Sequence, residues 1–253
     1  MTLRRKLIAF DMDDTLAITK SPISDQMAAL LPRLLEKYEV CVISGGKFEQ
    51  FKKQLIDRLE IDDTLLRKLH IMPTCGTRYY RYDDVTSEWK LMYAEDLSAS
   101  IKKQIVEVLS DGAKELGYWE EHPFGEIVED RGSQITFSAL GQQAPPEAKY
   151  AWDPDGVKKH ALRDYAAERL DGLEVRVGGT TSVDVTTIGI DKAYGMRKLI
   201  DVLNISKDDI FFIGDKLEEG GNDYPVKAYG IDTLQISKWE ETALVVEAII
   251  LAS

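Results

Sequence analysis

The sequence predicts a doubly wound α/β fold whose parallel sheet is interrupted by an inserted α+β domain. Short apolar runs alternate with amphipathic helical patterns near the N-terminus, as in a parallel sheet with helices on both faces. The pattern then changes to a hairpin and two longer helices, and the first pattern returns towards the C-terminus. We therefore expect a core of residues 1–80 and 189–253 around an insert of residues 81–188.

The first part of the expected core contains apolar strands that end at polar residues. Residues 7–10 form an apolar run that stops at Asp11, and residues 40–43 form another that stops at Ser44. Short runs that are apolar throughout are typical of strands covered on both faces. The other elements expected here are helices over residues 24–35, capped by Ser24, and 48–59, and a strand over residues 71–73.

The expected insert begins within a hairpin pattern. Residues 78–82 and 89–93 flank a polar turn at Asp83 and Asp84. The further elements expected are helices over residues 101–116 and 157–170 and strands over residues 134–138, 173–177 and 182–188, the last two joined through Gly178 and Gly179. A hairpin followed by helices and further strands indicates an α+β layer that is separate from the parallel sheet.

The core pattern resumes after Asp191. Residues 192–203 carry a helical apolar stripe, and the apolar run of residues 210–213 ends at Gly214 and Asp215. A short strand over residues 234–236 and a helix over residues 239–251 close the chain. This alternation completes the expected doubly wound sheet.

The composition excludes several classes of partner. The 253 residues carry a formal net charge of −12, which disfavours nonspecific binding to nucleic acid and docking on anionic membranes. No apolar run has the length of a membrane span or of a signal peptide's core, so we expect a cytoplasmic protein. We expect a monomer or a homodimer that acts on a small molecule. Cys41 and Cys75 lack metal-ligand spacing, and we expect two reduced thiols.

Four polar segments lie where core strands are expected to end. They are Asp11-Met12-Asp13, Ser44-Gly45-Gly46-Lys47, Lys192, and Gly214-Asp215 with Gly220-Gly221-Asn222-Asp223. Taken singly, each has an ordinary structural interpretation as an acidic helix cap, a glycine turn, a solvated lysine or a plain loop. Ligands of open α/β sheets bind outside the carboxyl ends of the strands, so together these segments predict one site.

The residue types in these segments suit phosphoryl transfer. Asp11 and Asp13 can supply a nucleophile and a proton carrier at one strand end. With Asp215 and Asp223 they also offer the oxygen ligands that a hard cation prefers. An acidic chain that handles phosphate needs local positive charge, which Lys192 and a bound cation would supply.

The loop after the second expected strand offers groups that can hold a phosphate. The hydroxyl of Ser44 and the unhindered backbone N–H of Gly45 can donate to phosphate oxygens. Alone this loop is a weak indication, because glycine-rich turns are common.

In this order, the four segments resemble the signature of the haloacid dehalogenase (HAD) superfamily, and the position of the insert resembles subfamily IIB. The resemblance covers nearly the whole chain and implies a Rossmann-like core, an α+β cap and a Mg²⁺-dependent phosphomonoester hydrolase. It implies Asp11 as nucleophile, Asp13 as acid/base and Lys192 as a catalytic cation. It further implies phosphate binding by Ser44, Gly45 and Asn222. It implies Mg²⁺ bound by the side chains of Asp11 and Asp215, by the backbone carbonyl of Asp13, and by Asp223 directly or through water.

Three longer stretches, residues 131–141, 178–185 and 214–223, resemble the eukaryotic-type phosphomannomutases. In that family an arginine, a serine and an aspartate of the cap hold the sugar phosphate. The matching residues here are Arg131, Ser182 and Asp184. The family carries further arginines where this chain has Gln142 and Val177, and both losses weaken the expected grip on a second phosphate.

We therefore expect a phosphatase that hydrolyses a small phosphorylated metabolite, a sugar phosphate, through an aspartyl-phosphate intermediate. A phosphomannomutase-like sugar phosphate mutase is the alternative, and a non-catalytic protein that binds phosphorylated metabolites is a second alternative. A CheY-like receiver domain also places an aspartate at a strand end. The pairing of Asp11 with Asp13 and the large insert argue against a receiver.

Overall fold

The computed structural model describes residues 5–178 and 180–253; Gly179, expected in a turn, lies outside the described residues. The chain divides into two compact units, one formed by Met1–Ala94 with Ile190–Ser253 and the other by Glu95–Gly189. The first unit is built on a sheet of mainly parallel strands with helices on both faces. The predicted α/β fold class is confirmed.

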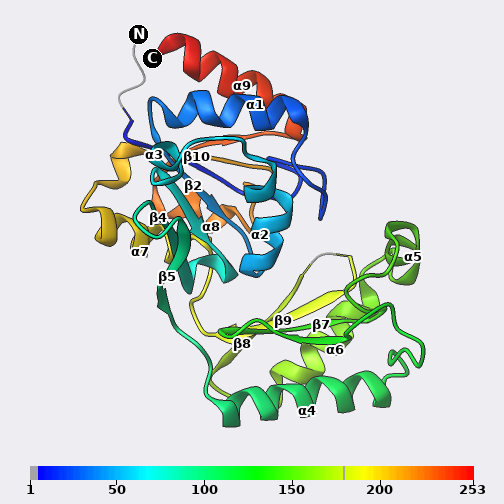
Figure 1. The fold of residues 1–253 in the computed structure, drawn as a ribbon. Helices are drawn as coiled ribbons and strands as arrows, with labels where there is room; N and C mark the ends of the chain where they lie inside the picture. The colour runs from blue at the N-terminus through cyan, green and yellow to red at the C-terminus, as the bar shows by residue number, and fades with distance from the viewer. Residues whose placement is uncertain (1–4, 179) are drawn as a thin grey trace. The chain divides into compact units, whose positions relative to one another are not determined.

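The first unit contains a seven-stranded sheet in the order β11-β10-β1-β2-β3-β4-β5 among the described residues (Figure 1). Its parallel strands are β1 (Leu7–Phe10), β2 (Glu39–Ile43), β3 (Leu69–Met72), β10 (Ile210–Gly214) and β11 (Asp232–Gln235). β4 (Arg78–Asp83) and β5 (Glu88–Ala94) extend the sheet in antiparallel fashion. Phe10 lies beside both Val42 and Ile213, so β1 ends one residue before its neighbours β2 and β10.

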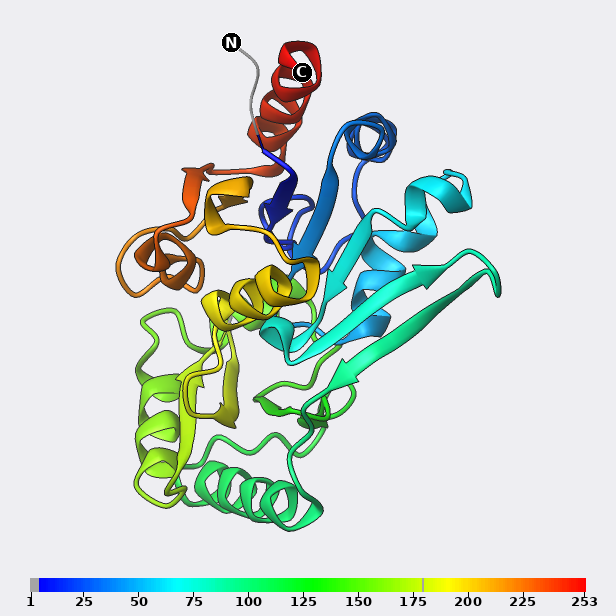
Figure 2. The same ribbon diagram turned by 90° about the vertical axis from the view of Figure 1, so that its left-hand side faces the viewer.

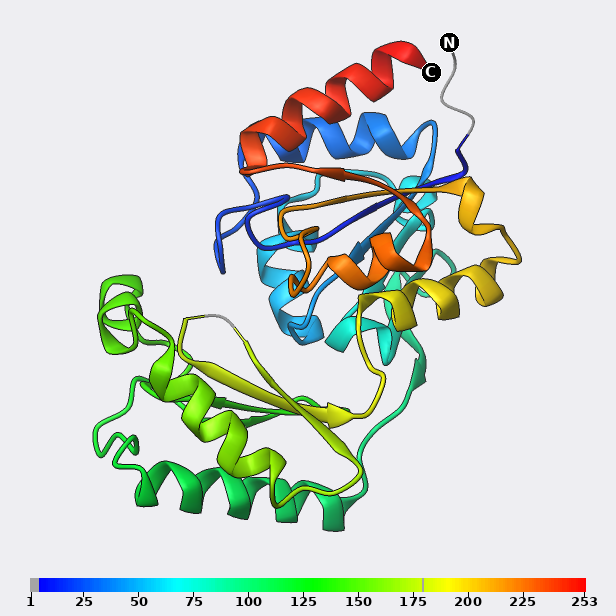
Figure 3. The same ribbon diagram turned by 180° about the vertical axis from the view of Figure 1, so that it is seen from behind.

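Helices cover both faces of this sheet. α1 (Asp25–Leu35) and α9 (Trp239–Ala252) lie side by side over one face, with α2 (Phe48–Gln54) in the same apolar cluster (Figures 1 and 3). α7 (Lys192–Leu203) and α8 (Tyr224–Tyr229) cover the other face. The remaining short elements are α3 (Asp63–Leu66), η1 (Ile56–Arg58), η2 (Thr74–Gly76) and η3 (Lys207–Asp209). Ser24 caps α1 as predicted, since its hydroxyl accepts from Met27 N at 3.2 Å.

The hairpin β4–β5 belongs to the core sheet and not to the insert. β4 pairs with β3, with His70 opposite Arg81, and the ring of Tyr80 stacks on Phe48 of α2 at a centroid distance of 4.0 Å. The expected boundary at residue 81 is therefore wrong, because the first unit continues to Ala94. The alternation in a hairpin does not reveal which sheet the hairpin extends, since pairing with β3 is a tertiary contact.

The second unit is an antiparallel sheet with helices on one face (Figures 2 and 3). Its strands, in the order β6-β7-β9-β8, are β6 (Val128–Asp130), β7 (Gln134–Ser138), β9 (Ser182–Thr187) and β8 (Leu173–Val177). Alternate residues such as Ile135, Phe137 and Val183 pack in one apolar cluster with α4 (Ala99–Glu115) and α6 (Val157–Ala167). The sequence did not predict β6 or the short helix α5 (Pro146–Trp152). None of the described helices has both the length and the apolar character of a bilayer span.

Candidate active site

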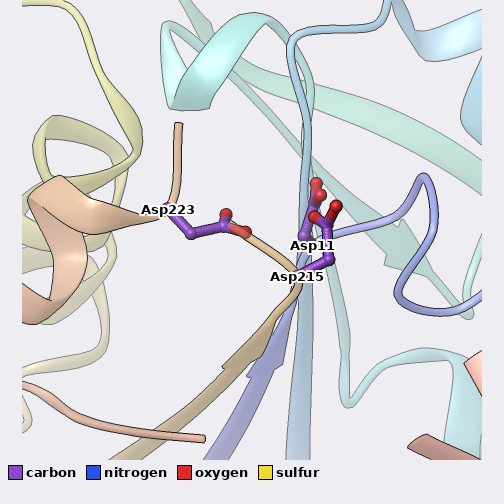
Figure 4. Close-up of side chains that lie close together, drawn as sticks. All are labelled: Asp11, Asp215 and Asp223. Atoms are coloured by element: carbon purple, nitrogen blue, oxygen red, sulfur yellow. The ribbon is translucent and has the colours of Figure 1, made fainter. Parts of the chain in front are cut away.

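Adjacent parallel strands bring two carboxylates to one edge of the core sheet. Asp11 directly follows β1, and Asp215 directly follows the neighbouring β10. The N–H of Asp11 donates to Ile213 O at 3.1 Å, which continues the strand ladder. Asp223 approaches from the loop before α8, and Figure 4 shows its carboxyl group directed towards the other two. One oxygen from each carboxylate lies within 4.8 Å of the others.

Lys192 is the buried positive charge of this cluster. Its Nζ lies 2.6 Å from Asp11 Oδ1 and 2.6 Å from Asp223 Oδ1, and its side chain is 1% exposed. It is the first residue of α7, where Asp191 caps the helix by accepting from Tyr194 N at 2.7 Å. Burial lowers the pKa of Lys192, but the carboxylates of Asp11 and Asp223 outweigh burial and leave that pKa above its ordinary value. The lysine is therefore a charged part of the cluster and not a solvated surface residue.

The carboxylates of the cluster outnumber the ammonium groups that contact them. Burial raises the pKa of Asp11 to about 8 although Lys192 opposes the rise, and the charge of Asp223 adds to it. Burial also raises the pKa of Asp215, whose Oδ2 pairs with the half-exposed Lys216 at 3.3 Å. The raised pKa values of these carboxyl groups indicate that too little positive charge lies close to them.

A divalent cation would supply the positive charge that this cluster lacks. Oδ1 of Asp215 is buried and has no hydrogen-bond partner in the part of the chain that the structure describes. Asp223 is held beside it, because Oδ1 accepts from Lys192 Nζ at 2.6 Å and Oδ2 accepts from Lys216 N at 3.1 Å. A set of carboxylate oxygens without histidine or cysteine suits Mg²⁺. The side chains of Asp11, Asp215 and Asp223 could therefore hold this cation.

Asp13 lies in the loop after β1, and its side chain is not among the three carboxylates of the cluster. Its Oδ1 accepts hydrogen bonds from Lys20 N at 2.8 Å and from Gln54 Nε2 at 3.1 Å. Asp14 braces the same loop, accepting from Thr19 N at 3.1 Å and from the Thr19 hydroxyl at 2.7 Å. The two acids of the Asp11–Asp13 pair thus have different environments, as two different roles require. Coordination by the Asp13 backbone carbonyl stays a prediction.

The loop that carries Ser44 and Gly45 follows β2, the strand next to β1. The hydroxyl of Ser44 accepts from Gly46 N at 3.2 Å. Apart from Gly45 and its two chain neighbours, no atom of the described residues lies within 4 Å of the position that a Cβ of Gly45 would take, so the space beside this backbone is open. Asn222 is exposed in the loop that carries Asp223. Its contact with a phosphate stays a prediction.

The second unit places two of the three predicted sugar-phosphate residues on the polar face of its sheet. Asp184 lies opposite Thr136 and accepts from the Thr136 hydroxyl at 2.6 Å. Ser182 lies opposite Ser138, with the hydroxyl oxygens 3.2 Å apart. These strand residues share one face because directly opposed residues of an antiparallel pair point the same way.

Arg131 is connected to this polar face through its ion pair with Glu129. Its Nε donates to Glu129 Oε2 at 2.7 Å, and Glu129 lies opposite Thr136 on the adjacent strand. The two charged side chains are 9% and 8% exposed. Nε2 of Gln142 is buried and has no hydrogen-bond partner among residues 5–178 and 180–253, and Lys149 Nζ donates to the backbone oxygen of Gln142 at 3.0 Å.

Residues 27–237 match the family model described as eukaryotic phosphomannomutase. The chain belongs to this family. It is 24% identical over 246 residues to a probable phosphomannomutase of Caenorhabditis elegans, covering 88% of this chain and 87% of that protein. It is 25% identical over 230 residues to phosphomannomutase 1 of Homo sapiens, covering 88% of this chain and 84% of that protein. The predicted membership of the HAD superfamily, with a phosphomannomutase-like sequence, is confirmed.

Solved structures show the same fold. A haloacid dehalogenase-like hydrolase from Bacteroides thetaiotaomicron superimposes with a TM-score of 0.66 at 18% identity, covering 97% of this chain and 99% of that chain. The ATP-bound IMP-nucleotidase of Plasmodium falciparum superimposes with a TM-score of 0.72 at 16% identity, covering 98% of this chain and 61% of that chain. At these identities the likeness establishes the HAD fold. Together with the family match it supports an enzyme of HAD type.

The structure adds partners that the sequence did not predict. Gln54 contacts Asp13, Thr136 contacts Asp184, and Glu129 contacts Arg131. The alternation of polar residues at positions 134, 136 and 138 in β7 indicated a polar face and could have identified Thr136. No sequence pattern identifies Gln54, because its contact joins the end of α2 to a loop that lies 41 positions away.

Proposed function

We propose that this protein is a Mg²⁺-dependent phosphatase that hydrolyses a small phosphorylated metabolite, a sugar phosphate, with Asp11 as nucleophile. The observation that carries the proposal is the buried cluster of Asp11, Lys192 and Asp223, with Asp215 at its side. One carboxylate at a strand end, one buried ammonium and two further carboxylates combine a nucleophile, a fixed cation and a metal site.

In the proposed first step, a carboxylate oxygen of Asp11 attacks phosphorus, and the bond from phosphorus to the leaving oxygen breaks. Asp13 donates a proton to that leaving oxygen, and an aspartyl phosphate remains on Asp11. In the second step a water molecule gives a proton to Asp13 and attacks the same phosphorus, which releases inorganic phosphate and restores Asp11. Asp13 thus ends the cycle protonated, as it began.

Positive charge beside the phosphoryl group is the other requirement of this chemistry. Lys192 already contacts Asp11, so its ammonium lies where charge would collect on the transferring oxygens. Bound Mg²⁺, held by Asp11, Asp215 and Asp223, would neutralise phosphate charge at the same place. Ser44, Gly45 and Asn222 would donate hydrogen bonds to the phosphate oxygens.

The second unit is proposed to act as a cap that recognises the rest of the substrate. Arg131 offers a cation, while Ser182 and Asp184 offer hydroxyl and carboxylate groups on a sheet face that is polar throughout β7 and β9. Sugar hydroxyls need such mixed donors and acceptors. The hydrogen bond from Thr136 keeps Asp184 in one orientation on this face.

A mutase that isomerises a sugar phosphate is the second candidate, favoured by the match to the phosphomannomutase family. A mutase must bind a bisphosphorylated intermediate, so it needs cations for two phosphates. Nε2 of Gln142, which has no partner among the described residues, can donate to a phosphate but carries no charge. A hydrogen bond to a charged partner contributes roughly 1.5–3 kcal/mol against roughly 1 kcal/mol for a neutral pair. We therefore place hydrolysis before isomerisation.

One experiment separates the candidates. Enzyme with Mg²⁺ is incubated with mannose 1-phosphate or glucose 1-phosphate, with and without a hexose 1,6-bisphosphate, and both free phosphate and hexose 6-phosphate are measured. We expect free phosphate to form faster than hexose 6-phosphate. Faster formation of hexose 6-phosphate would replace the phosphatase by the mutase. Absence of turnover over a wide panel of phosphomonoesters would favour the non-catalytic binding protein.

A further inference from the structure

The side chain of Gln54 is buried beside the loop that carries Asp13. It is 3% exposed at the last position of α2, and its Nε2 donates to Asp13 Oδ1 at 3.1 Å and to Ser21 O at 3.0 Å. Both hydrogens of the amide are therefore used, one on the carboxylate and one on the backbone of the same loop. A buried amide with both donors engaged is held in a single orientation.

The backbone of Gln54 fixes the same loop from a second direction. Its carbonyl oxygen accepts from Ile23 N at 2.8 Å. The loop itself contains two non-glycine residues with left-handed backbone conformation, Asp14 at φ 60° and Lys20 at φ 57°. Such conformations persist only where surrounding contacts determine them. The end of α2 and the N–H of Lys20 therefore hold the Asp13 carboxylate in a conformation that the loop alone would not keep.

We propose that Gln54 is a positioning residue for the acid/base Asp13. Two N–H groups, from Gln54 and from Lys20, occupy Oδ1 of Asp13. No residue in the described part of the chain donates to Oδ2, so Oδ2 is the oxygen that exchanges a proton with the leaving group and with water. The amide of Gln54 thus selects which carboxylate oxygen performs the proton transfer.

α2 connects the contact between Gln54 and Asp13 to the loop that is proposed to bind the phosphate. The helix begins at Phe48, directly after the loop of Ser44 and Gly45, and ends at Gln54. Its core residue Phe51 is fully buried in the apolar cluster beneath the sheet. One rigid element thus joins the loop proposed to hold the phosphate to the contact that orients the proton donor. Positioning errors of about 1 Å can cost about 10²-fold in rate.

The inference rests on the proposed function, and the leaving group provides the test. Protonation matters greatly for the poor alkoxide leaving group of a hexose 6-phosphate and little for nitrophenolate. In Gln54→Met, we expect single-turnover cleavage of the hexose phosphate to slow by about 10- to 100-fold. The initial burst of nitrophenolate from p-nitrophenyl phosphate should change less than about threefold by the same argument. Gln26→Met, at an exposed position of α1, should behave as wild type with both substrates.

A double substitution separates positioning from a general loss of structure. If Gln54 acts through Asp13, Gln54→Met should slow hexose phosphate cleavage no further once Asp13→Asn is present. If Gln54→Met does not fold, Gln54→Glu keeps the length of the side chain while removing both N–H donors, and the same comparisons apply. Equal slowing of both substrates, or additive losses in the double variant, would overturn the inference. Wild-type enzyme that releases no phosphate would contradict the proposed function instead.

Discussion

Lys192 and Asp11 form an ion pair at 2.6 Å in which the two side chains are 1% and 6% exposed. A buried pair is costly to break from one side, because the remaining charge is left without a partner. Here the lysine serves two carboxylates, since Asp223 also contacts it. The pair therefore couples the stability of the core sheet to the chemistry proposed at its edge.

Lys192→Met should damage activity and stability together. We expect hydrolysis to slow by at least about 10²-fold, because a fixed positive group at the transferring phosphate is removed. We also expect the free energy of unfolding at neutral pH to fall by about 3 kcal/mol, because two buried carboxylates lose their partner. Phosphate release and urea denaturation measure the two effects. Lys198→Met, in the same helix but over the rings of Tyr93 and Tyr194, should change hydrolysis little. Equal effects of the two substitutions on hydrolysis would contradict the role of Lys192.

Mg²⁺ should bind at the carboxylate cluster and stabilise the folded protein. Chelation with EDTA should abolish phosphate release, and Mg²⁺ should restore it. In thermal unfolding without substrate, Mg²⁺ should raise the midpoint of wild-type protein, because ligands that bind only the folded state stabilise it. The same ion should raise the midpoint of Asp215→Asn less, since that variant loses one carboxylate charge of the proposed metal site. Full activity in chelator, with no metal detected in the protein, would exclude the metal site.

The cluster of carboxylates at the edge of the core sheet could be predicted from the sequence, because an acidic residue that directly follows an apolar run marks the end of a strand. The apolar run of β1 stops at Asp11 and that of β10 stops at Asp215, and the parallel register of the two strands brings both acids to one place. The burial of Lys192 could not be predicted, because an isolated lysine at a helix start is usually solvated. Its burial follows from the way α7 packs on the sheet, which is a tertiary property.

The errors in the predicted fold have a related cause. The alternation in β4 and β5 predicted a hairpin correctly, but its membership of the core sheet depends on pairing with β3 and on the stacking of Tyr80 against Phe48. The strand β6 was not predicted, because its three residues are too few to show the alternation of apolar and polar residues that is typical of a strand. The contact between Gln54 and Asp13 likewise joins elements whose separation in sequence carries no pattern.

Substitutions at two glycines test core packing and phosphate binding separately. In Gly195→Ala the new Cβ would lie 2.5 Å from Ile43 Cδ1 and 2.7 Å from the backbone oxygen of Cys75, so we expect a loss of about 1–3 kcal/mol in unfolding free energy. Gly45→Ala meets no atom within 4 Å, so its stability should change by less than about 0.5 kcal/mol. The Michaelis constant of Gly45→Ala should nevertheless rise, because the methyl group obstructs the phosphate. An unchanged Michaelis constant would exclude Gly45 from the phosphate site.

The buried His70 should make stability depend on pH. Its Nδ1 lies 2.8 Å from the hydroxyl of Tyr79 and its Nε2 lies 2.9 Å from Glu39 Oε2. Burial lowers its pKa from 6.5, with Arg81 adding to the effect and Glu39 opposing it. The unfolded chain therefore takes up a proton at a higher pH than the folded one. The contribution of His70 to stability is fully present above pH 6.5 and is lost as the pH falls below that value towards the folded pKa.

Urea denaturation one pH unit above and one below the ordinary histidine pKa tests this dependence. Between the higher and the lower pH, the change in unfolding free energy should be more destabilising for wild-type protein than for His70→Gln, because the substituted amide does not titrate. His160→Gln, in the second unit, is the matched control and should keep the wild-type dependence. Identical pH dependence in all three proteins would contradict a lowered pKa at His70.

Turnover by Asp11→Asn and Asp11→Ala tests directly whether Asp11 is the nucleophile. Both variants should unfold cooperatively in urea, which shows that they are folded, and a hexose 6-phosphate with Mg²⁺ is the substrate in which free phosphate is measured. We expect wild-type enzyme to release phosphate and neither variant to do so above the uncatalysed rate. Phosphate release by either folded variant at a rate close to that of wild type would contradict covalent catalysis by Asp11.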